Sequence, residues 1–283
     1  MISVKNLSYT YPGSDNPVLD KLNFEISEGE IFGFLGPSGA GKSTTQKILY
    51  KILVDFEGEV DIRQKPLRSW GKEFFELIGV GFELPNHYLK LTARENLELF
   101  ASFYNREKLL PFDELFEMVG LAEHQRQRVE AYSKGMKMRL NFIRALMHDP
   151  DILFFDEPTA GLDPVNAHKI KAHISKLKKR GKTIFITTHN MTTADELCDR
   201  VAFIVNGRLQ LTEVPSVLKH QHGERRVFVE ATDRKTAEFA LDDLGRNEVF
   251  LQFLRDHPVE RIHTKEASLE EVFIQVTGQA LKP

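Results

Sequence analysis

The sequence predicts an α/β fold built on buried parallel strands, and two stretches carry this prediction. The run Ile31-Phe32-Gly33-Phe34-Leu35 is apolar throughout, which is typical of a parallel strand covered on both faces. A glycine-rich turn follows it, and apolar residues at helical spacing continue from Thr44 to about Leu53. The run Ile152-Leu153-Phe154-Phe155 is equally apolar and leads into two carboxylates. Sheets of such strands carry helices on both faces, as in α/β proteins.

The glycine-rich turn, Gly36-Pro37-Ser38-Gly39-Ala40-Gly41-Lys42-Ser43-Thr44, matches the P-loop (Walker A) pattern G-x-x-x-x-G-K-[ST]. In this pattern backbone N–H groups surround the phosphates of a nucleotide, and the helix that follows adds partial positive charge. Lys42 is placed to reach the β- and γ-phosphates, and the Ser43 hydroxyl is placed to hold Mg²⁺. About 0.01 chance matches are expected in a chain of this length. The turn therefore predicts a nucleotide site.

Residues 2–30 are expected to form a small antiparallel β region. Val4, Leu7 and Tyr9 alternate roughly, turn residues lie between positions 11 and 17, and a second alternating run covers 18–26. Tyr11 is a candidate for stacking on an adenine ring, because an aromatic face binds a base without hydrogen bonds. A core or turn tyrosine is an equally good interpretation of this residue.

The middle of the chain, residues 85–147, is rich in helical patterns and is interpreted as an insertion between strands of the nucleotide-binding sheet. Thr92 and Glu95 form a capping box at the start of one of these helices. The expected elements of this part and of the segment before it are strands at 58–62 and 77–83 and helices at 92–104, 112–119 and 138–147.

Polar residues follow two buried strands in the last third of the nucleotide-binding region. Asp156-Glu157 follows the run 152–155, and His189 follows a β-branched run at 182–188. Ligands of open α/β sheets bind at the carboxyl ends of the strands, so these side chains are candidates for the nucleotide site. The alternative for the two acids is a strand that ends in a solvated acidic turn. Helices are predicted at 164–180 and from Thr192 or Thr193 onward, and Asn206-Gly207 predicts a hairpin.

Residues 219–283 are interpreted as a small α+β appendage without visible chemistry of its own, attached to a first domain at 1–218. The expected elements of the appendage are strands at 226–231 and 259–264 and helices at 235–244, 249–254 and 269–276.

Composition narrows the class of protein. The chain of 283 residues is 41% hydrophobic and 28% charged with a formal net charge of −3, as expected of a water-soluble globular protein. No basic excess points to nucleic acid, so we expect no nucleic-acid partner. No apolar run approaches the ~20 residues that span a bilayer. Cys198 is the only cysteine, which excludes an intrachain disulfide and fits a reducing cytosol.

Taken together, four motifs resemble those of the ATP-binding subunit of ABC transporters. They are the P-loop, the segment Tyr132-Ser133-Lys134-Gly135-Met136-Lys137, the run from Phe154 to Pro164, and Thr187-Thr188-His189. The resemblance covers about residues 2–218. It implies a P-loop NTPase cassette with a mixed sheet core, an antiparallel β subdomain and a helical subdomain at 85–147. It also implies ATP and Mg²⁺ as ligands.

For the nucleotide and its metal, the resemblance implies contacts from three parts of the chain. Tyr11 stacks on the adenine, and residues 36–44 hold the phosphates, with Lys42 among the catalytic residues. Ser43 and Asp156 organise Mg²⁺.

For catalysis and for contact between two cassettes, the resemblance implies roles for five further residues. Glu157 is the general base that polarises the attacking water, and His189 contacts the γ-phosphate. Ser133 and Gly135 touch the γ-phosphate of the ATP bound to a partner subunit. Asp163 belongs to a loop that communicates across the dimer.

The sequence departs from the family pattern in two places. The signature, usually L-S-G-G-Q, here reads Tyr132-Ser133-Lys134-Gly135-Met136, so only the serine and the second glycine are kept. The position usually held by a Mg²⁺-sensing glutamine reads Glu83. Because a further carboxylate near the triphosphate is repelled unless it faces a cation, and Mg²⁺ prefers hard oxygen ligands, we predict that Glu83 lies on the metal side of the site. The alternative is that Glu83 points to solvent and merely ends a strand.

The function that the resemblance implies is ATP hydrolysis coupled to transmembrane transport. Two cassettes, as a homodimer or as a heterodimer with a second cassette, close on ATP and drive an integral membrane permease at the cytoplasmic face of the membrane. The tail 268–273 resembles the extension of export cassettes, which favours an exporter. One alternative is a non-transport ABC ATPase, but neither a long coiled-coil insertion nor a second cassette is visible. The other is a regulatory nucleotide-binding module, which Glu157 and His189 disfavour.

Overall fold

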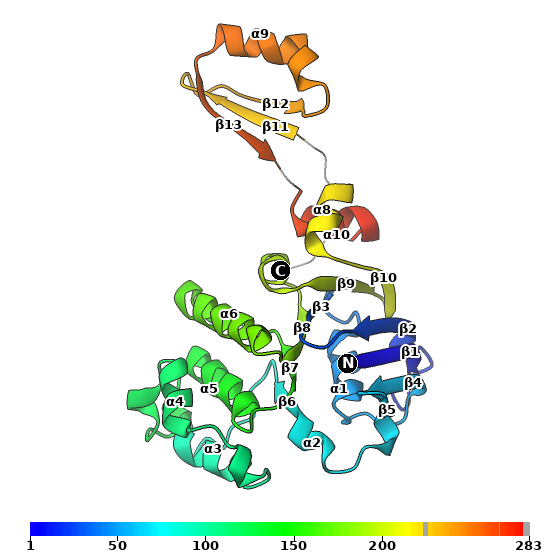
Figure 1. The fold of residues 1–283 in the computed structure, drawn as a ribbon, viewed down its shortest axis with the longest axis vertical. Helices are drawn as coiled ribbons and strands as arrows, with labels where there is room; N and C mark the ends of the chain where they lie inside the picture. Colours follow the sequence, from blue (N-terminus) through cyan, green and yellow to red (C-terminus); the bar gives the residue numbers. More distant parts are fainter. Residues whose placement is uncertain (223–225, 266, 280–283) are drawn as a thin grey trace. The chain divides into compact units, whose positions relative to one another are not determined.

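The computed structural model describes residues 1–222, 226–265 and 267–279, and the chain divides into two compact units, Met1–Thr212 and Glu213–Pro283 (Figure 1). The boundary expected after residue 218 falls inside helix α8 (Pro215–His222). This helix packs against α10 (Leu269–Thr277) within the second unit, which is why it belongs to that unit. Among the described residues, no helix combines the length and apolar character needed to cross a membrane.

The first unit is built on a six-stranded sheet in the order β10-β9-β3-β8-β7-β6. Its strands are β3 (Ile31–Leu35), β6 (Ile78–Gly81), β7 (Ile152–Asp156), β8 (Thr183–Thr188), β9 (Arg200–Val205) and β10 (Arg208–Glu213). The five strands from β9 to β6 pair in parallel. Leu35 pairs with Thr188, and Asp156 pairs with Thr187, so the carboxyl ends of β3, β7 and β8 lie at one edge of the sheet.

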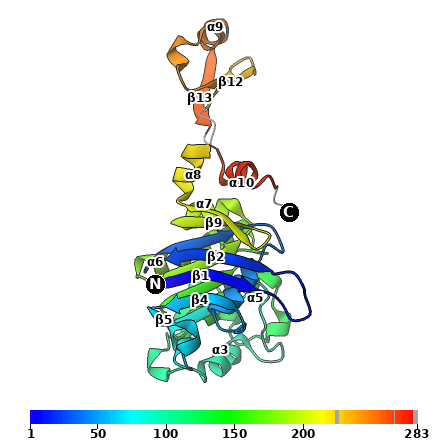
Figure 2. The ribbon, with the colours of Figure 1, turned by 90° about the vertical axis from the view of Figure 1, so that its right-hand side faces the viewer.

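A second, four-stranded antiparallel sheet has the order β2-β1-β4-β5 (Figure 2). Its strands are β1 (Ile2–Tyr9), β2 (Leu19–Ile26), β4 (Glu57–Ile62) and β5 (Lys65–Pro66). The main core lies between the two sheets. Phe24 of β2 has its ring centroid 5.8 Å from that of Phe32 and 5.4 Å from that of Phe34, both on β3. Burial of each such ring stabilises the fold by about 1.5–3 kcal/mol. This packing holds β3 against the second sheet.

The helices of the first unit are α1 (Lys42–Leu49), α2 (Phe74–Leu77), α3 (Ala93–Ala101), α4 (Phe112–Met118), α5 (Lys134–Leu146), α6 (Pro164–Lys179) and α7 (Met191–Leu197). Short 3₁₀ turns cover Leu67–Ser69, Arg106–Lys108, Ala122–His124 and Val129–Ala131. The capping box of Thr92 and Glu95 is confirmed at the start of α3. The expected start of α7 at Thr192 or Thr193 is wrong, because the Asn190 side chain accepts a hydrogen bond from the Thr193 N–H at 2.8 Å and caps the helix earlier.

The second unit contains an antiparallel three-stranded sheet in the order β12-β11-β13 and the helix α9 (Glu248–Asp256). The strands are β11 (Arg226–Ala231), β12 (Thr236–Ala240) and β13 (Val259–Lys265). The helix expected at 235–244 is wrong: β12 occupies most of it, and a 3₁₀ turn covers Leu244–Arg246. Pairing of Phe239 with Val227 buries Phe239 against Phe250 of α9, so tertiary packing overrides the local helical pattern.

Candidate nucleotide-binding and catalytic site

The P-loop leaves β3 and turns directly into α1, as the sequence predicts. Two of its glycines are required by the surrounding backbone. A Cβ atom on Gly36 would lie 2.1 Å from the carbonyl oxygen of Ile204 on β9. Gly41, the N-cap of α1, has φ +106°, a conformation that side chains other than glycine rarely adopt. The loop therefore passes close to β9 and presents the N-terminus of α1.

Lys42 lies buried beneath this loop and faces acidic residues. Its Nζ donates to the carbonyl oxygens of Gly36 at 2.7 Å and Pro37 at 3.0 Å. Burial lowers the pKa of Lys42, while the negative charges of Glu157, Asp156 and Glu83 act in the opposite direction. The Lys42 ammonium therefore lies within the electrostatic field of the carboxylates that are expected at the nucleotide site.

Glu157 is held in one orientation by the end of β8. Its backbone has φ +49°, an uncommon value for a residue with a side chain. The carboxylate is 7% exposed and accepts hydrogen bonds from the Thr188 hydroxyl at 2.8 Å and from the His189 N–H at 2.8 Å. The Nδ1 atom of His189 lies 2.6 Å from the same carboxylate. The structure therefore brings Glu157 and His189 together as a fixed pair, with the His189 ring about half exposed.

Each of the predicted metal ligands carries oxygen donors. Asp156 ends β7 and accepts a hydrogen bond from the Thr187 hydroxyl, Ser43 is the second residue of α1, and Glu83 follows β6 and is exposed. Over the described residues, no group of three or more His, Cys, Asp or Glu side chains converges as a metal site of its own. Mg²⁺ commonly takes one or two carboxylates together with phosphate oxygens and water. The donor set therefore fits Mg²⁺ held jointly with a nucleotide.

Tyr11 lies beside the P-loop helix. Its hydroxyl is 3.2 Å from the Thr44 hydroxyl, and its ring meets Tyr9 edge-on with the centroids 4.9 Å apart. These contacts fix the half-buried ring beside the first turn of α1. Stacking on adenine stays a prediction.

Ser133, Gly135 and Asp163 form a second group at the N-termini of α5 and α6. The Ser133 hydroxyl caps α5 by accepting from the Met136 N–H at 3.2 Å. A Cβ on Gly135 would lie 3.5 Å from Leu162, in the loop that leads to Asp163. Asp163 caps α6, and hydrogen bonds from Asn166 hold its pKa below the usual range. Each residue has a structural role within the chain, and their roles toward a partner's nucleotide stay predictions.

The sequence alone indicates no individual role for Thr187 or Thr188. In the structure the Thr187 hydroxyl binds Asp156, and the Thr188 hydroxyl binds Glu157. Both are buried, and both end a strand whose carboxyl end lies at the ligand edge of the sheet. A buried threonine at that edge is the signal that points to such a role, because its hydroxyl needs a partner there.

Two family models match the chain. Residues 19–160 match the family described as ABC transporter. Residues 225–266 match the family described as fluoroquinolone efflux ABC transporter C-terminal domain.

Several curated proteins and solved structures are similar to the chain. A fluoroquinolones export ATP-binding protein of Mycobacterium tuberculosis is 52% identical, over 99% of this chain and 94% of that protein. The bacitracin transport ATP-binding protein BcrA of Bacillus licheniformis is 37% identical, over 89% of this chain and 78% of that protein. The dimeric, post-hydrolysis structure of the ATP-binding cassette MJ0796 bound to ADP and Pi has a TM-score of 0.70 at 30% identity and covers 76% of this chain and 98% of that one.

Replacing Thr188 with valine should slow ATP turnover without weakening ATP binding. A hydrogen bond to a charged group contributes about 1.5–3 kcal/mol, which corresponds to roughly 10–100-fold in rate if it acts in the transition state. We expect kcat to fall at least about 10-fold in a phosphate-release assay. Thr183→Val is the matched control, because Thr183 is buried on the same strand and accepts one hydrogen bond, from the Gly29 N–H. A normal kcat for Thr188→Val would show that Thr188 does not orient Glu157.

Proposed function

We propose a specific working cycle, on the premise that this chain belongs to the ABC transporter family and is the ATP-hydrolysing subunit of an export system. In this cycle two cassettes close on ATP, hydrolysis reopens them, and a membrane permease converts the motion into export. The observation that carries the proposal is the Glu157 carboxylate, fixed by Thr188 and His189 at the same edge of the sheet as Lys42.

The chemistry follows from that arrangement. Lys42 and the N-terminus of α1 offer positive charge to the β- and γ-phosphates of ATP. Glu157 orients and polarises the attacking water. The Nδ1 atom of His189 contacts Glu157, and the rest of the ring is positioned to contact the γ-phosphate. Ser43 and Asp156 would hold Mg²⁺, which when bound neutralises charge on the phosphates. Catalysis then rests on positioning and on charge stabilisation.

A second cassette is proposed to complete each site. Ser133 and Gly135 stand at the N-terminus of α5, next to the loop that ends in Asp163. Lys134 and Lys137 place positive charge in the first turn of α5, where no acidic residue balances it. Such an end is suited to the γ-phosphate of an ATP molecule held by the partner. We propose a homodimer or a dimer with a second cassette.

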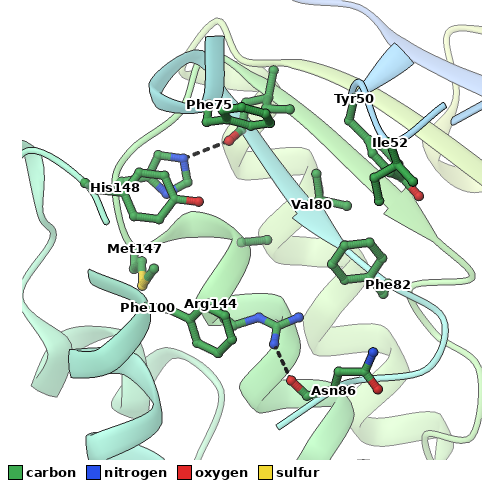
Figure 3. A pocket seen from close by; sticks show the side chains of 13 residues that line it. Tyr50, Ile52, Phe75, Val80, Phe82, Asn86, Phe100, Arg144, Met147 and His148 are labelled. Carbon is green, nitrogen blue, oxygen red and sulfur yellow. Dashed lines mark hydrogen bonds between the residues drawn. The ribbon is translucent and has the colours of Figure 1, made fainter. Parts of the chain in front are cut away.

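A groove in the first unit supports the proposal of a permease partner. A pocket of about 290 Å³ lies between β6, α3 and α5 and is lined largely by apolar and aromatic side chains, among them Tyr50, Phe82 and Phe100 (Figure 3). Large apolar side chains of the same segments are also exposed, with Ile52 57% and Phe103 74% accessible. Apolar surface of this kind marks interaction sites. We propose that the groove receives a segment of the permease, which would keep the chain at the cytoplasmic face of the membrane.

The proposed cargo is a drug of the fluoroquinolone class. The match of residues 225–266 to a fluoroquinolone efflux domain and the 52% identity to a fluoroquinolones export protein support this assignment. The permease, a separate chain, would select the drug, and this subunit would supply the energy. Efflux of a fluoroquinolone from cells that carry both subunits, and its loss when Lys42 is replaced, tests the assignment.

Glu157→Gln should bind ATP but hydrolyse it 10²–10⁴-fold more slowly, the order of magnitude expected for a lost general base. Because the ATP-bound state then persists, the variant should form a dimer that size-exclusion chromatography detects. Retention of a fluorescent ATP analogue serves as the folding control. Substantial steady-state hydrolysis by this variant would remove Glu157 from the role of base.

Mixing two inactive variants tests whether the sites are shared. Ser133→Arg should abolish ATP-driven dimerisation and leave the ATP affinity of the monomer nearly unchanged, since Ser133 acts on the partner's nucleotide. Lys42→Ala should lose phosphate binding in its own chain. A mixture can form one site with both residues intact and should regain ATPase activity. Activity no higher than that of either chain alone would argue against the composite site.

A further inference from the structure

A buried polar network lies directly behind the segment that carries Glu83. Its centre is the pair Asn141 and Arg144 on α5, which are 2% and 7% exposed. The Arg144 Nη2 donates to the Asn141 side-chain oxygen at 2.7 Å, so the two act as one unit. Neither residue has a role among those assigned above to the nucleotide site.

The network binds the backbone on both sides of Glu83. Asn141 donates to the carbonyl oxygen of Phe82 at 2.7 Å, and Arg144 donates to that of Asn86 at 2.9 Å. One residue before Glu83 and three residues after it are therefore tied to the same helix. A third tie, between His87 Nε2 and the carbonyl oxygen of Lys137 at 3.0 Å, extends the contact toward the start of α5.

The choice of an arginine at this position is informative. Burial lowers the pKa of Arg144 to about 10, and among the described residues no carboxylate forms an ion pair with it. Its guanidinium lies 4.6 Å from the ring centroid of Phe100 and 5.8 Å from that of Phe82. A buried guanidinium without an acid is costly, and an apolar side chain would fill the space at a lower cost. What arginine provides and an apolar side chain could not are the hydrogen bonds to Asn141 and to the Asn86 carbonyl oxygen.

We propose that Asn141 and Arg144 are positioning residues that fix residues 82–86 so that Glu83 stands on the metal side of the nucleotide site. The inference rests on the proposed function and on the prediction from the sequence that Glu83 faces Mg²⁺. Gly81 of β6 pairs with Phe155 of β7, and β7 ends at Asp156, so the Glu83 segment leaves the sheet at the same edge as Asp156. Because α5 begins beside Ser133, the same network makes the Glu83 segment and the signature residues move together.

Binding of Mn²⁺, used in place of Mg²⁺, tests the proposal without relying on turnover. Free Mn²⁺ is measured by electron paramagnetic resonance with ATP-loaded protein in the Glu157→Gln background. Asn141→Leu, which keeps the size but removes the hydrogen bonds, should weaken Mn²⁺ binding on the order of 10-fold. Glu83→Ala should weaken it similarly, and the double variant should be no weaker than Glu83→Ala alone. Arg144→Lys keeps the charge but lacks the planar guanidinium that spans the Asn141 side chain and the Asn86 carbonyl oxygen, so it should weaken Mn²⁺ binding as well.

Asn96→Leu is the matched control. Asn96 is fully buried and binds the backbone N–H and carbonyl of Tyr88, at 2.9 and 3.0 Å, farther along the same segment. It should lower thermal stability as much as Asn141→Leu but leave the Mn²⁺ affinity unchanged.

The outcomes separate this inference from the function on which it rests. If Glu83→Ala weakens Mn²⁺ binding and Asn141→Leu does not, the positioning role is overturned while the role of Glu83 stands. If Asn96→Leu weakens binding equally, or if the effects of Asn141→Leu and Glu83→Ala add, the positioning role is also overturned. If Glu83→Ala has no effect, both the metal role of Glu83 and the positioning role are overturned. If the parent fails to bind Mn²⁺ with ATP, the proposed function itself fails.

Discussion

The pairing of β7 with β8 is the constraint on which the rest of the site depends. Asp156 pairs with Thr187 in this register, so Glu157, the next residue, reaches Thr188 and His189. The pairing of β3 with the same strand brings the P-loop to that edge. A slip of one residue would turn every side chain of a strand to the opposite face and separate Glu157 from Thr188 and His189. The phenylalanine core between the two sheets holds these registers.

The parts of the site that could be predicted from the sequence are those formed by motifs local in the chain. The P-loop and the acids at the end of β7 each follow an apolar run directly, so the residue pattern and its strand can be recognised together in the sequence. The contact of Thr188 with Glu157 and that of Asn141 with Phe82 join residues far apart in sequence, so no local pattern reveals them. The helix expected at 235–244 failed for the same reason, because Phe239 is placed by pairing with Val227.

Helix α5 reaches three regions of the first unit that have proposed roles. Its N-terminus carries Ser133 and Gly135, its middle binds the Glu83 segment through Asn141 and Arg144, and its far end lines the groove proposed for the permease. A displacement of this helix would therefore reach the proposed partner's nucleotide, the metal side of the chain's own site, and the membrane subunit together. Rigid helices that carry side chains to several sites are one physical means of coupling such sites.

Cross-linking tests the central claim, that two chains share each ATP site, most directly. The only native cysteine, Cys198, is buried, so a chain with Ser38→Cys and Lys134→Cys, in the Glu157→Gln background, offers two exposed thiols for a short bis-maleimide. The account predicts a covalent dimer that forms when ATP is added and is absent without it, and no such dimer from either single cysteine variant. The shared-site claim would be contradicted if only monomer were found at saturating ATP, or if the dimer formed equally with and without ATP.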